Sequence, residues 1–252
     1  MPRIVTLLTD FGTADGYVGE MKGVLSTLAP NAVLVDVAHD VAPHDVDGAR
    51  LAFARYWRRF PEGTVHLVVI DPGVGSARGA LAATSEGRFL VGPDNGVLSP
   101  ALLHADARCV SLPLPAGAAP TFHGRDVFAP AAAQLALGAA VETLGAEEDD
   151  PVIRRTPEAT RRADGGVQGE IITVDRFGNA VTNLLAMRGG EVHVGALALP
   201  VRRTYADVAT GEAVALVGSS GLVEIAVRDG SAARKLGLRR GSEVVLVAGK
   251  KQ

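Results

Sequence analysis

The sequence predicts a two-domain α/β protein. A mostly parallel α/β sandwich domain is expected over residues 1–150, and a smaller β-rich barrel or sandwich domain over residues 167–252. In the first part, apolar runs alternate with stretches of helical periodicity, as in a sheet covered by helices. Residues 151–166 lie in a charged, proline-containing stretch without periodicity, which indicates a linker between domains. After it, short β-rich segments are separated by glycine turns, and only residues 231–236 show a helical pattern.

The first domain begins in the order β-α-β-α-β. Residues 4–9, 32–37 and 66–70 are apolar runs of strand length, and residues 15–30 and 45–60 place apolar side chains at helical spacing. Because these strands are continuously apolar and alternate with helices, we expect parallel strands joined by right-handed crossovers.

Further strands follow in both domains. Residues 80–84 and 89–91 are predicted to be antiparallel additions to the sheet, and Gly92 to Gly96 form a tight polar turn after them. Residues 121–126 precede an alanine-rich helix that ends near Leu137. The strands predicted for the second domain are residues 167–174, 180–184, 192–199, 213–217, 222–227 and 243–247.

Composition excludes several classes of protein. Of the 252 residues, 47% are hydrophobic and 21% are charged, which is typical of a globular protein and not of a disordered one. The net charge of −3 is spread along the chain, so nothing favours nucleic acid or an anionic membrane as a partner. Cys109 is the only cysteine, and no apolar run approaches the ~20 residues that span a bilayer. The start of the chain lacks a signal-peptide pattern, so the sequence predicts a soluble cytoplasmic protein.

The segment VVIDPGVGSARG, from Val68 to Gly79, is the first candidate site. An apolar strand stops at Asp71, Pro72-Gly73 turns the chain, and Arg78 follows seven positions after the aspartate. Ligands of open α/β sheets bind at the carboxyl ends of strands, which favours a site here. A hairpin with a capping aspartate and a solvated arginine is the alternative.

Carboxylates follow three predicted strands, and three histidines are expected near the same edge. These residues are Asp10, Asp40, Asp71, His39, His44 and His123. One hypothesis is a metal site, because His39-Asp40 and His44-Asp45 place imidazole and carboxylate ligands close together. Against it, the sequence lacks the usual metal-binding spacings, and Asp45 can serve as a helix cap.

The other hypothesis is a site without metal, built from Asp71, Arg78 and His123. A histidine oriented by an aspartate can take a proton from water, while an arginine holds the oxygen as charge develops. A histidine next to a glycine at a helix start can equally well satisfy backbone groups.

The second domain contains a different signal, Asp175-Arg176-Phe177-Gly178-Asn179. An amide can hydrogen-bond an adenine-like edge, and a phenylalanine can stack on a planar base. A hairpin turn with a buried phenylalanine is the alternative. The chain has neither a GxGxxG segment after the first strand nor a Walker-type lysine, which disfavours dinucleotide and P-loop nucleotide binding.

Taken together, several segments resemble the S-adenosyl-L-methionine hydroxide adenosyltransferases, which are relatives of the fluorinases and chlorinases. The matching segments are LLTDFGTADGYVGEMKG, VDVAHDVAPHDVDGA, VVIDPGVGSARGAL, VGPDNGVLSP, TFHGRDVFAPAAA, VDRFGNAVTNL and GSSGLVEIAVRDGSAA. They extend from residue 6 to residue 233 in family order.

The resemblance implies a homotrimer whose ligand lies between the first domain of one subunit and the second domain of its neighbour. It implies attack on C5′ of S-adenosyl-L-methionine, with L-methionine leaving and adenosine forming when water attacks, and no cofactor. The implied catalytic residues are Asp71, Arg78 and His123. The implied substrate-binding residues are Asp10 for the ribose, Phe177 and Asn179 for adenine, Asp175 for the methionine ammonium, Ser219 for its carboxylate, and His44 and Phe122.

The resemblance also favours water over halide as the nucleophile. The halogenases carry a tyrosine in place of Asp71, tend to carry a tryptophan at His44, and in the fluorinase branch have an added loop after the PDNG segment. One departure from the halogenases is Ser220, where they have an arginine, so this sequence leaves the partner of the methionine carboxylate open. The alternatives are a 5′-halogenase and a non-catalytic binder of S-adenosyl-L-methionine or adenosine.

Overall fold

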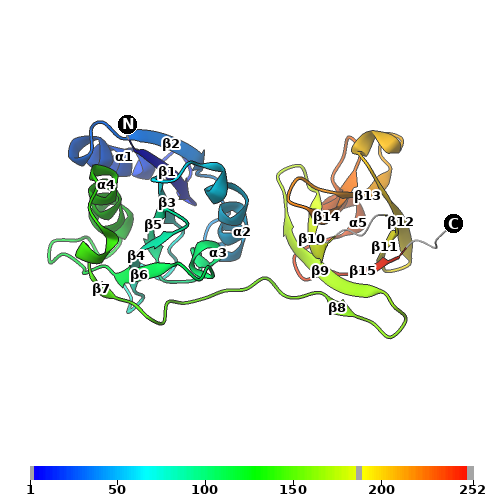
Figure 1. The fold of residues 1–252 in the computed structure, drawn as a ribbon. Helices are drawn as coiled ribbons and strands as arrows, with labels where there is room; N and C mark the ends of the chain where they lie inside the picture. The colour runs from blue at the N-terminus through cyan, green and yellow to red at the C-terminus, as the bar shows by residue number, and fades with distance from the viewer. Residues whose placement is uncertain (1–2, 186–188, 249–252) are drawn as a thin grey trace. The chain divides into compact units, whose positions relative to one another are not determined.

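The chain folds into two compact units, Met1–Arg155 and Thr156–Gln252 (Figure 1). The computed structural model describes residues 3–185 and 189–248. The predicted order, an α/β part followed by a β-rich part, is confirmed. The first unit ends inside the segment that the sequence assigns to the linker, and two residues of that segment, Thr160–Arg161, form the short strand β8.

The first unit is built on a seven-stranded sheet of order β2-β1-β3-β5-β4-β6-β7. The strands are β1 (Ile4–Thr9), β2 (Val33–Ala38), β3 (Val65–Val69), β4 (Ala80–Ser85), β5 (Arg88–Pro93), β6 (Arg108–Ser111) and β7 (Ala146–Glu147). Strands β2, β1, β3 and β5 are parallel, and β4, β6 and β7 extend the sheet by antiparallel pairs. The predicted hairpin of β4 and β5 is present, but β5 is not an antiparallel addition to the sheet, because it pairs in parallel with β3.

Helices cover both faces of this sheet. They are α1 (Tyr17–Leu28), α2 (Val46–Tyr56), α3 (Ser99–Leu102) and α4 (Ala129–Leu137). Because side chains alternate along a strand, Leu7 of β1 packs in the core beneath α1 and α4, whereas Leu8 packs in the core beneath α2 and α3. Asp45 caps α2 by accepting a hydrogen bond from the Gly48 amide at 3.0 Å, the role expected for a helix cap. Among the described residues, no helix is both long and apolar enough to cross a membrane.

The second unit is a closed barrel. Its strands are β9 (Val167–Val174), β10 (Ala180–Leu185), β11 (Glu191–Val194), β12 (Leu197–Arg202), β13 (Ala213–Val217), β14 (Leu222–Val227) and β15 (Glu243–Val247). Pairing of β9 with β10 closes the barrel, and β8 pairs with β9 at its edge. The single strand predicted over residues 192–199 is wrong, because a turn at Gly195, with φ of 56°, divides it into β11 and β12. The predicted helix is present as α5 (Ala232–Leu236).

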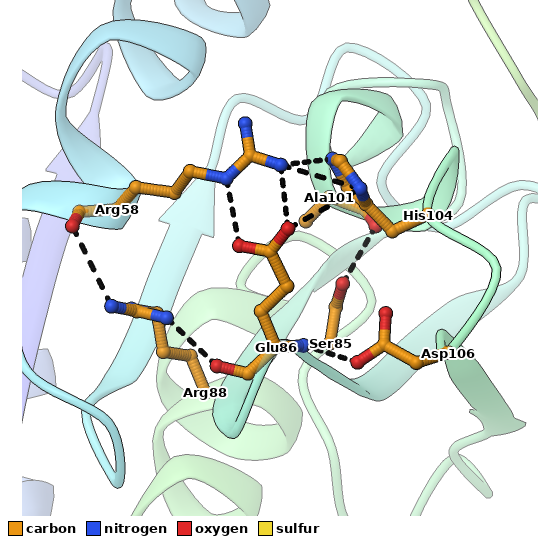
Figure 2. Close-up of polar contacts among 7 residues, drawn as sticks. All are labelled: Arg58, Ser85, Glu86, Arg88, Ala101, His104 and Asp106. Carbon is orange, nitrogen blue, oxygen red and sulfur yellow. Dashed lines mark hydrogen bonds and ion pairs between the residues drawn. The ribbon is translucent and has the colours of Figure 1, made fainter.

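A polar cluster fixes the β4–β5 turn at the edge of the sheet opposite the carboxyl end of β3 (Figure 2). Arg58 donates two hydrogen bonds to the Glu86 carboxylate, each 2.7 Å long, and also contacts His104. The Glu86 amide donates to Asp106 at 2.7 Å, and Arg88 donates to the Glu86 carbonyl at 2.7 Å. Glu86 has a φ of 46°, unusual for a residue other than glycine, and these contacts from both sides hold it there.

Candidate active site

Asp71 and Arg78 form a buried ion pair at the carboxyl end of β3. Arg78 Nε donates to Asp71 Oδ1 at 3.0 Å, and Nη2 donates to Oδ2. Nη1 donates to the Gly79 carbonyl at 2.8 Å, and the side chains of Asp71 and Arg78 are only 5% and 7% exposed. The alternative of a solvated arginine is therefore wrong. The guanidinium is held in one orientation by the paired contact with the carboxylate.

The loop between these two residues is tight and needs its glycine. Ser76 Oγ donates to the Gly73 carbonyl at 2.7 Å and accepts from the Arg78 amide at 3.2 Å. Gly75 has a φ of 77°, and a Cβ there would lie 2.5 Å from the Pro120 carbonyl oxygen. The loop thus packs against the backbone that leads to His123, which explains the requirement for glycine.

His123 lies against the arginine of this pair. It is 4% exposed and directly precedes a π-helical turn, Gly124–Phe128, that continues into α4. Its Nδ1 is 3.1 Å from Arg78 Nη2. Because a guanidinium can only donate, this contact requires Nδ1 to accept and leaves the ring proton of a neutral His123 on Nε2. The structure thus brings Asp71, Arg78 and His123 into one contact set.

The environment of Asp71 makes its carboxylate more basic than usual. Burial raises the pKa of Asp71, and this effect outweighs the opposing influence of the Arg78 guanidinium and of its hydrogen bonds. A carboxylate with a raised pKa accepts a proton more readily, which is a property of catalytic bases.

Asp71 and His123 line a cavity of about 380 Å³. Its apolar side carries three aromatic rings in edge-to-face contact. Their centroids are 5.8 Å apart for Phe11 and Phe122, 6.0 Å for Phe11 and Tyr17, and 5.3 Å for Tyr17 and Phe122. Neither Phe11 nor Tyr17 was predicted from the sequence as a site residue. An aromatic residue two positions after the end of the first strand was the available signal for Phe11.

Asp10 and His44 come together at the same edge of the sheet. The His44 amide donates to Asp10 Oδ2 at 2.8 Å, with His44 at a φ of 66°. Parallel pairing of β1 with β3 puts the residues that follow Thr9 and Val69 side by side, so Asp10 and Asp71 leave the same sheet edge. The pair Asp10–His44 can therefore present a carboxylate near the cavity.

His39 holds the ends of strands β1 and β2 together next to Asp10. Its Nδ1 lies 2.9 Å from Thr9 Oγ1, its Nε2 lies 3.0 Å from Asp36 Oδ1, and its carbonyl accepts from the Gly12 amide at 2.7 Å. These contacts join the ends of β1 and β2. Within the residues that the structure describes, no three His, Cys, Asp or Glu side chains gather as a set able to hold a metal ion, so the proposed His39 and His44 ligand set is not assembled.

In the second unit, the DRFGN segment is the turn between β9 and β10. Asp175 Oδ1 accepts from the amides of Phe177 at 2.9 Å and Asn179 at 2.8 Å, and Oδ2 accepts from Asn179 Nδ2 at 2.9 Å. The expected hairpin is present, but Phe177 is 78% exposed, so the alternative of a buried phenylalanine is wrong. Gly178, with φ of 85°, packs so tightly that a Cβ would lie 2.0 Å from Ser231 Oγ. The turn therefore presents its aromatic ring to solvent from a rigid base.

Ser219 lies exposed in the turn between β13 and β14. The Glu224 carboxylate packs closely against the neighbouring Gly218, since a Cβ at Gly218 would lie 1.8 Å from Glu224 Oε1. Burial together with the carboxylates of Glu224 and Asp175 raises the pKa of Tyr205. Tyr205 and Glu224 thus adjoin the Asp175 turn, and neither was singled out from the sequence, because their proximity depends on how the barrel closes.

Comparison with known proteins identifies the family. The N-terminal domain of the SAM hydroxide adenosyltransferases matches residues 5–145, and the C-terminal domain matches residues 169–245. An (R)-S-adenosyl-L-methionine hydrolase from Thermus thermophilus is 47% identical, with 97% of this chain and 100% of that protein covered. A fluorinase from Actinopolyspora mzabensis is 29% identical, with 96% of each covered.

A solved structure shares the fold of this chain. The crystal structure of an uncharacterized conserved protein from Thermotoga maritima superposes with a TM-score of 0.87 at 31% identity, covering 96% of this chain and 99% of that one. The resemblance in the sequence motifs is thereby confirmed: this chain belongs to the SAM hydroxide adenosyltransferase family.

Proposed function

We propose that this protein hydrolyses S-adenosyl-L-methionine to adenosine and L-methionine by attack of water on C5′. The observation that carries the proposal is the contact set of Asp71, Arg78 and His123 beside a cavity, in a chain whose family and 47% identical relative are named for this chemistry. The relative's name specifies the R form of the substrate, and we propose the same form here.

The reaction needs a nucleophile and alignment more than it needs an acid. The water oxygen forms a bond to C5′, the C5′–S bond breaks, and its electron pair leaves on sulfur as the neutral thioether of methionine. Because this leaving group is neutral, no proton has to be delivered to it. The water proton passes to a base, and the aligned geometry supplies much of the rate enhancement.

We assign the base to Asp71 and the oxygen-holding donors to Arg78 and His123. From the sequence, His123 oriented by Asp71 was the expected base. The contact of Arg78 Nη2 with His123 Nδ1 favours the opposite assignment, since it leaves His123 Nε2 as a donor. The raised pKa of Asp71 suits it to accept the proton, and its remaining lone pairs are available for water.

The remaining site residues keep the roles that the family resemblance implies, as proposals. Asp10 would bind the ribose diol, Phe177 would stack on adenine, and Asp175 would meet the methionine ammonium. Asn179, Ser219, His44 and Phe122 complete the set. We propose a homotrimer in the cytoplasm that acts without a cofactor.

The test uses the purified protein in ¹⁸O-labelled water without halide. Each sulfonium form of S-adenosyl-L-methionine is supplied separately, and products are followed by mass spectrometry. Labelled adenosine and unlabelled L-methionine, formed from the R form, are the expected result. Product formed only after chloride or fluoride is added would replace hydrolysis with 5′-halogenation, and binding without product would indicate a sensor.

A further inference from the structure

The PDNG turn (residues 93–96), at the carboxyl end of β5, contacts the peptide that carries Asp71. Pairing between β3 and β5 ends at Leu67 and Val91, before β3 reaches its carboxyl end. Beyond that point, Asn95 Nδ2 donates to the Ile70 carbonyl at 2.8 Å. This carbonyl belongs to the peptide that joins Ile70 to Asp71. On this side of β3, the hydrogen bond from the Asn95 side chain to Ile70 therefore replaces the strand pairing that has ended.

The same turn holds the other end of the Asp71–Arg78 loop. The Asp94 amide donates to the Gly79 carbonyl at 2.8 Å, and Arg78 Nη1 donates to the same carbonyl at 2.8 Å. Gly79 also packs closely on Asp94, since a Cβ at Gly79 would lie 3.3 Å from Asp94 Cβ. Two neighbouring residues of one turn thus fix both members of the ion pair, one through Ile70 and the other through Gly79.

The chain that leaves the first unit in turn holds the PDNG turn. The Val152 amide donates to Asp94 Oδ1 at 2.7 Å, and Arg154 Nε donates to the Asn95 carbonyl at 2.8 Å. Gly96 has a φ of 90°, and a Cβ there would lie 2.3 Å from Arg154 Cγ, so the arginine side chain lies directly on the turn. The first unit ends one residue later.

We propose that Asn95 is a positioning residue for Asp71, and that Arg154 supports it by fixing the PDNG turn. The kinetic part of this inference rests on the proposed hydrolase function. An amide-to-carbonyl bond at this place limits movement of the carboxylate relative to the attacking water. Misplacement of a reacting group by ~1 Å costs on the order of 100-fold in rate, so loss of the bond should appear in kcat.

Three substitutions separate the contacts. Asn95→Asp keeps the shape and the oxygen that accepts from the Val97 amide at 3.2 Å, but it loses the donor to Ile70. Asn95→Ala loses both contacts. Arg154→Ala leaves Asn95 in place and removes this support, together with the 3.3 Å ion pair between Arg154 and Asp47. The matched control is Asn183→Ala in the second unit, where the amide likewise donates to a carbonyl, that of Pro157, at 2.8 Å and accepts from a backbone amide.

The expected kinetic result is a fall in kcat of about 10- to 100-fold in both Asn95 variants, with KM for S-adenosyl-L-methionine within about threefold of the wild type. Arg154→Ala should lose less, about three- to tenfold. Asn183→Ala should keep its kcat. In an Asp71→Asn background, Asn95→Ala should cost little more, because both changes act on the same group.

A second measurement does not depend on activity. In protein labelled with ¹⁵N-arginine, the Arg78 Nε–H signal, assigned with Arg78→Lys, reports the bond to Asp71. Its hydrogen exchange should accelerate in both Asn95 variants and stay unchanged in Asn183→Ala. Faster exchange in a protein that leaves S-adenosyl-L-methionine intact would retain the positioning role and reject the hydrolase function. Unchanged exchange, or an Asn95→Asp enzyme with wild-type kcat, would overturn the positioning role itself.

Discussion

Asp71 and Arg78 allow a direct test of how the first unit tolerates two buried charges. Their side chains are 5% and 7% exposed and share two hydrogen bonds. Replacing Asp71 with alanine leaves a buried guanidinium without its carboxylate. Replacing both residues, as Asp71→Leu with Arg78→Met, removes both charges and keeps a similar apolar volume.

The expected energies follow from burial of the pair. Breaking a buried ion pair by removing one partner costs about 3–5 kcal/mol of the free energy of unfolding, whereas replacing both partners by apolar side chains is neutral or stabilising by ~1–4 kcal/mol. Asp71→Ala should therefore be strongly destabilised and the double variant should recover fully. For a unit of this size, ~3 kcal/mol corresponds to a fall of about 6–12 °C in Tm.

The pH dependence gives a further check on the same pair. The pKa of Asp71 is raised in the folded protein, so its stabilising contribution is present below the unfolded pKa of ~3.9 and is lost as pH rises through the folded pKa. Without the arginine the carboxyl can become neutral by taking up a proton. Arg78→Met should therefore be less destabilised at pH 5 than at pH 8.

Urea denaturation followed by tryptophan fluorescence isolates the first unit, because Trp57 is the only tryptophan of the chain and is buried there. Midpoints at pH 5 and pH 8 for the wild type, both single variants and the double variant complete the cycle. A double variant that loses the sum of the two single losses would refute this reasoning, as would an Asp71→Ala protein within ~1 kcal/mol of the wild type.

Three further outcomes test other parts of the molecule. Burial lowers the pKa of His66 to about 3, so the stability that the neutral ring contributes is fully present above pH ~6.5. As the solution is acidified, the free energy of unfolding should fall by up to ~1.4 kcal/mol per pH unit. His66→Phe should flatten this pH dependence in urea titrations between pH 4 and 7. Gly178→Ala should destabilise the second unit by ~2–4 kcal/mol in hydrogen exchange, because of its φ of 85° and the contact with Ser231, and should leave the tryptophan transition of the first unit unchanged. Glu86→Gln removes the ion pair with Arg58 at the sheet edge opposite the site and should leave kcat within about twofold in a steady-state assay.

The position of Asp71 could be predicted from the sequence because its determinants are local. An apolar run ended by Pro-Gly defines the end of a buried strand, and a carboxylate there lies at the edge where ligands bind. The contacts that hold Asp71 could not be predicted in the same way. Arg78 returns to it through a loop packed against Pro120, and Asn95 reaches the Ile70 carbonyl from a different strand. Such contacts depend on which strands become neighbours.

The second unit shows where a local pattern misleads. Apolar residues continue through the segment VHVGALAL, so the alternation reads as one strand over residues 192–199. Gly195 instead takes a left-handed conformation, and β11 turns back onto β12. The residues of the DRFGN segment fitted either a base-binding segment or a hairpin turn with a buried phenylalanine, whereas the structure has the turn with Phe177 exposed.

The choice of base is the point at which sequence reasoning and geometry diverge most. Histidine is the default base from sequence because its pKa lies near neutrality. For His123 to act this way toward the cavity, the lone pair would have to be on Nε2, which would place the Nδ1 proton against a guanidinium N–H 3.1 Å away. Asp71 faces no such conflict, since it only accepts.

We therefore expect His123→Gln, which retains a side-chain N–H donor, to lose only about tenfold in kcat, and Asp71→Asn to lose about 10²–10⁴-fold, the usual contribution of a general base. Single-turnover rates measured under saturating substrate compare the two variants directly. The wild-type rate should rise with pH as the Asp71 carboxyl loses its proton. This rising limb of the pH–rate profile should persist in His123→Gln, because the titrating group is still present. A larger loss in His123→Gln than in Asp71→Asn, together with disappearance of that limb, would return the role of base to the histidine.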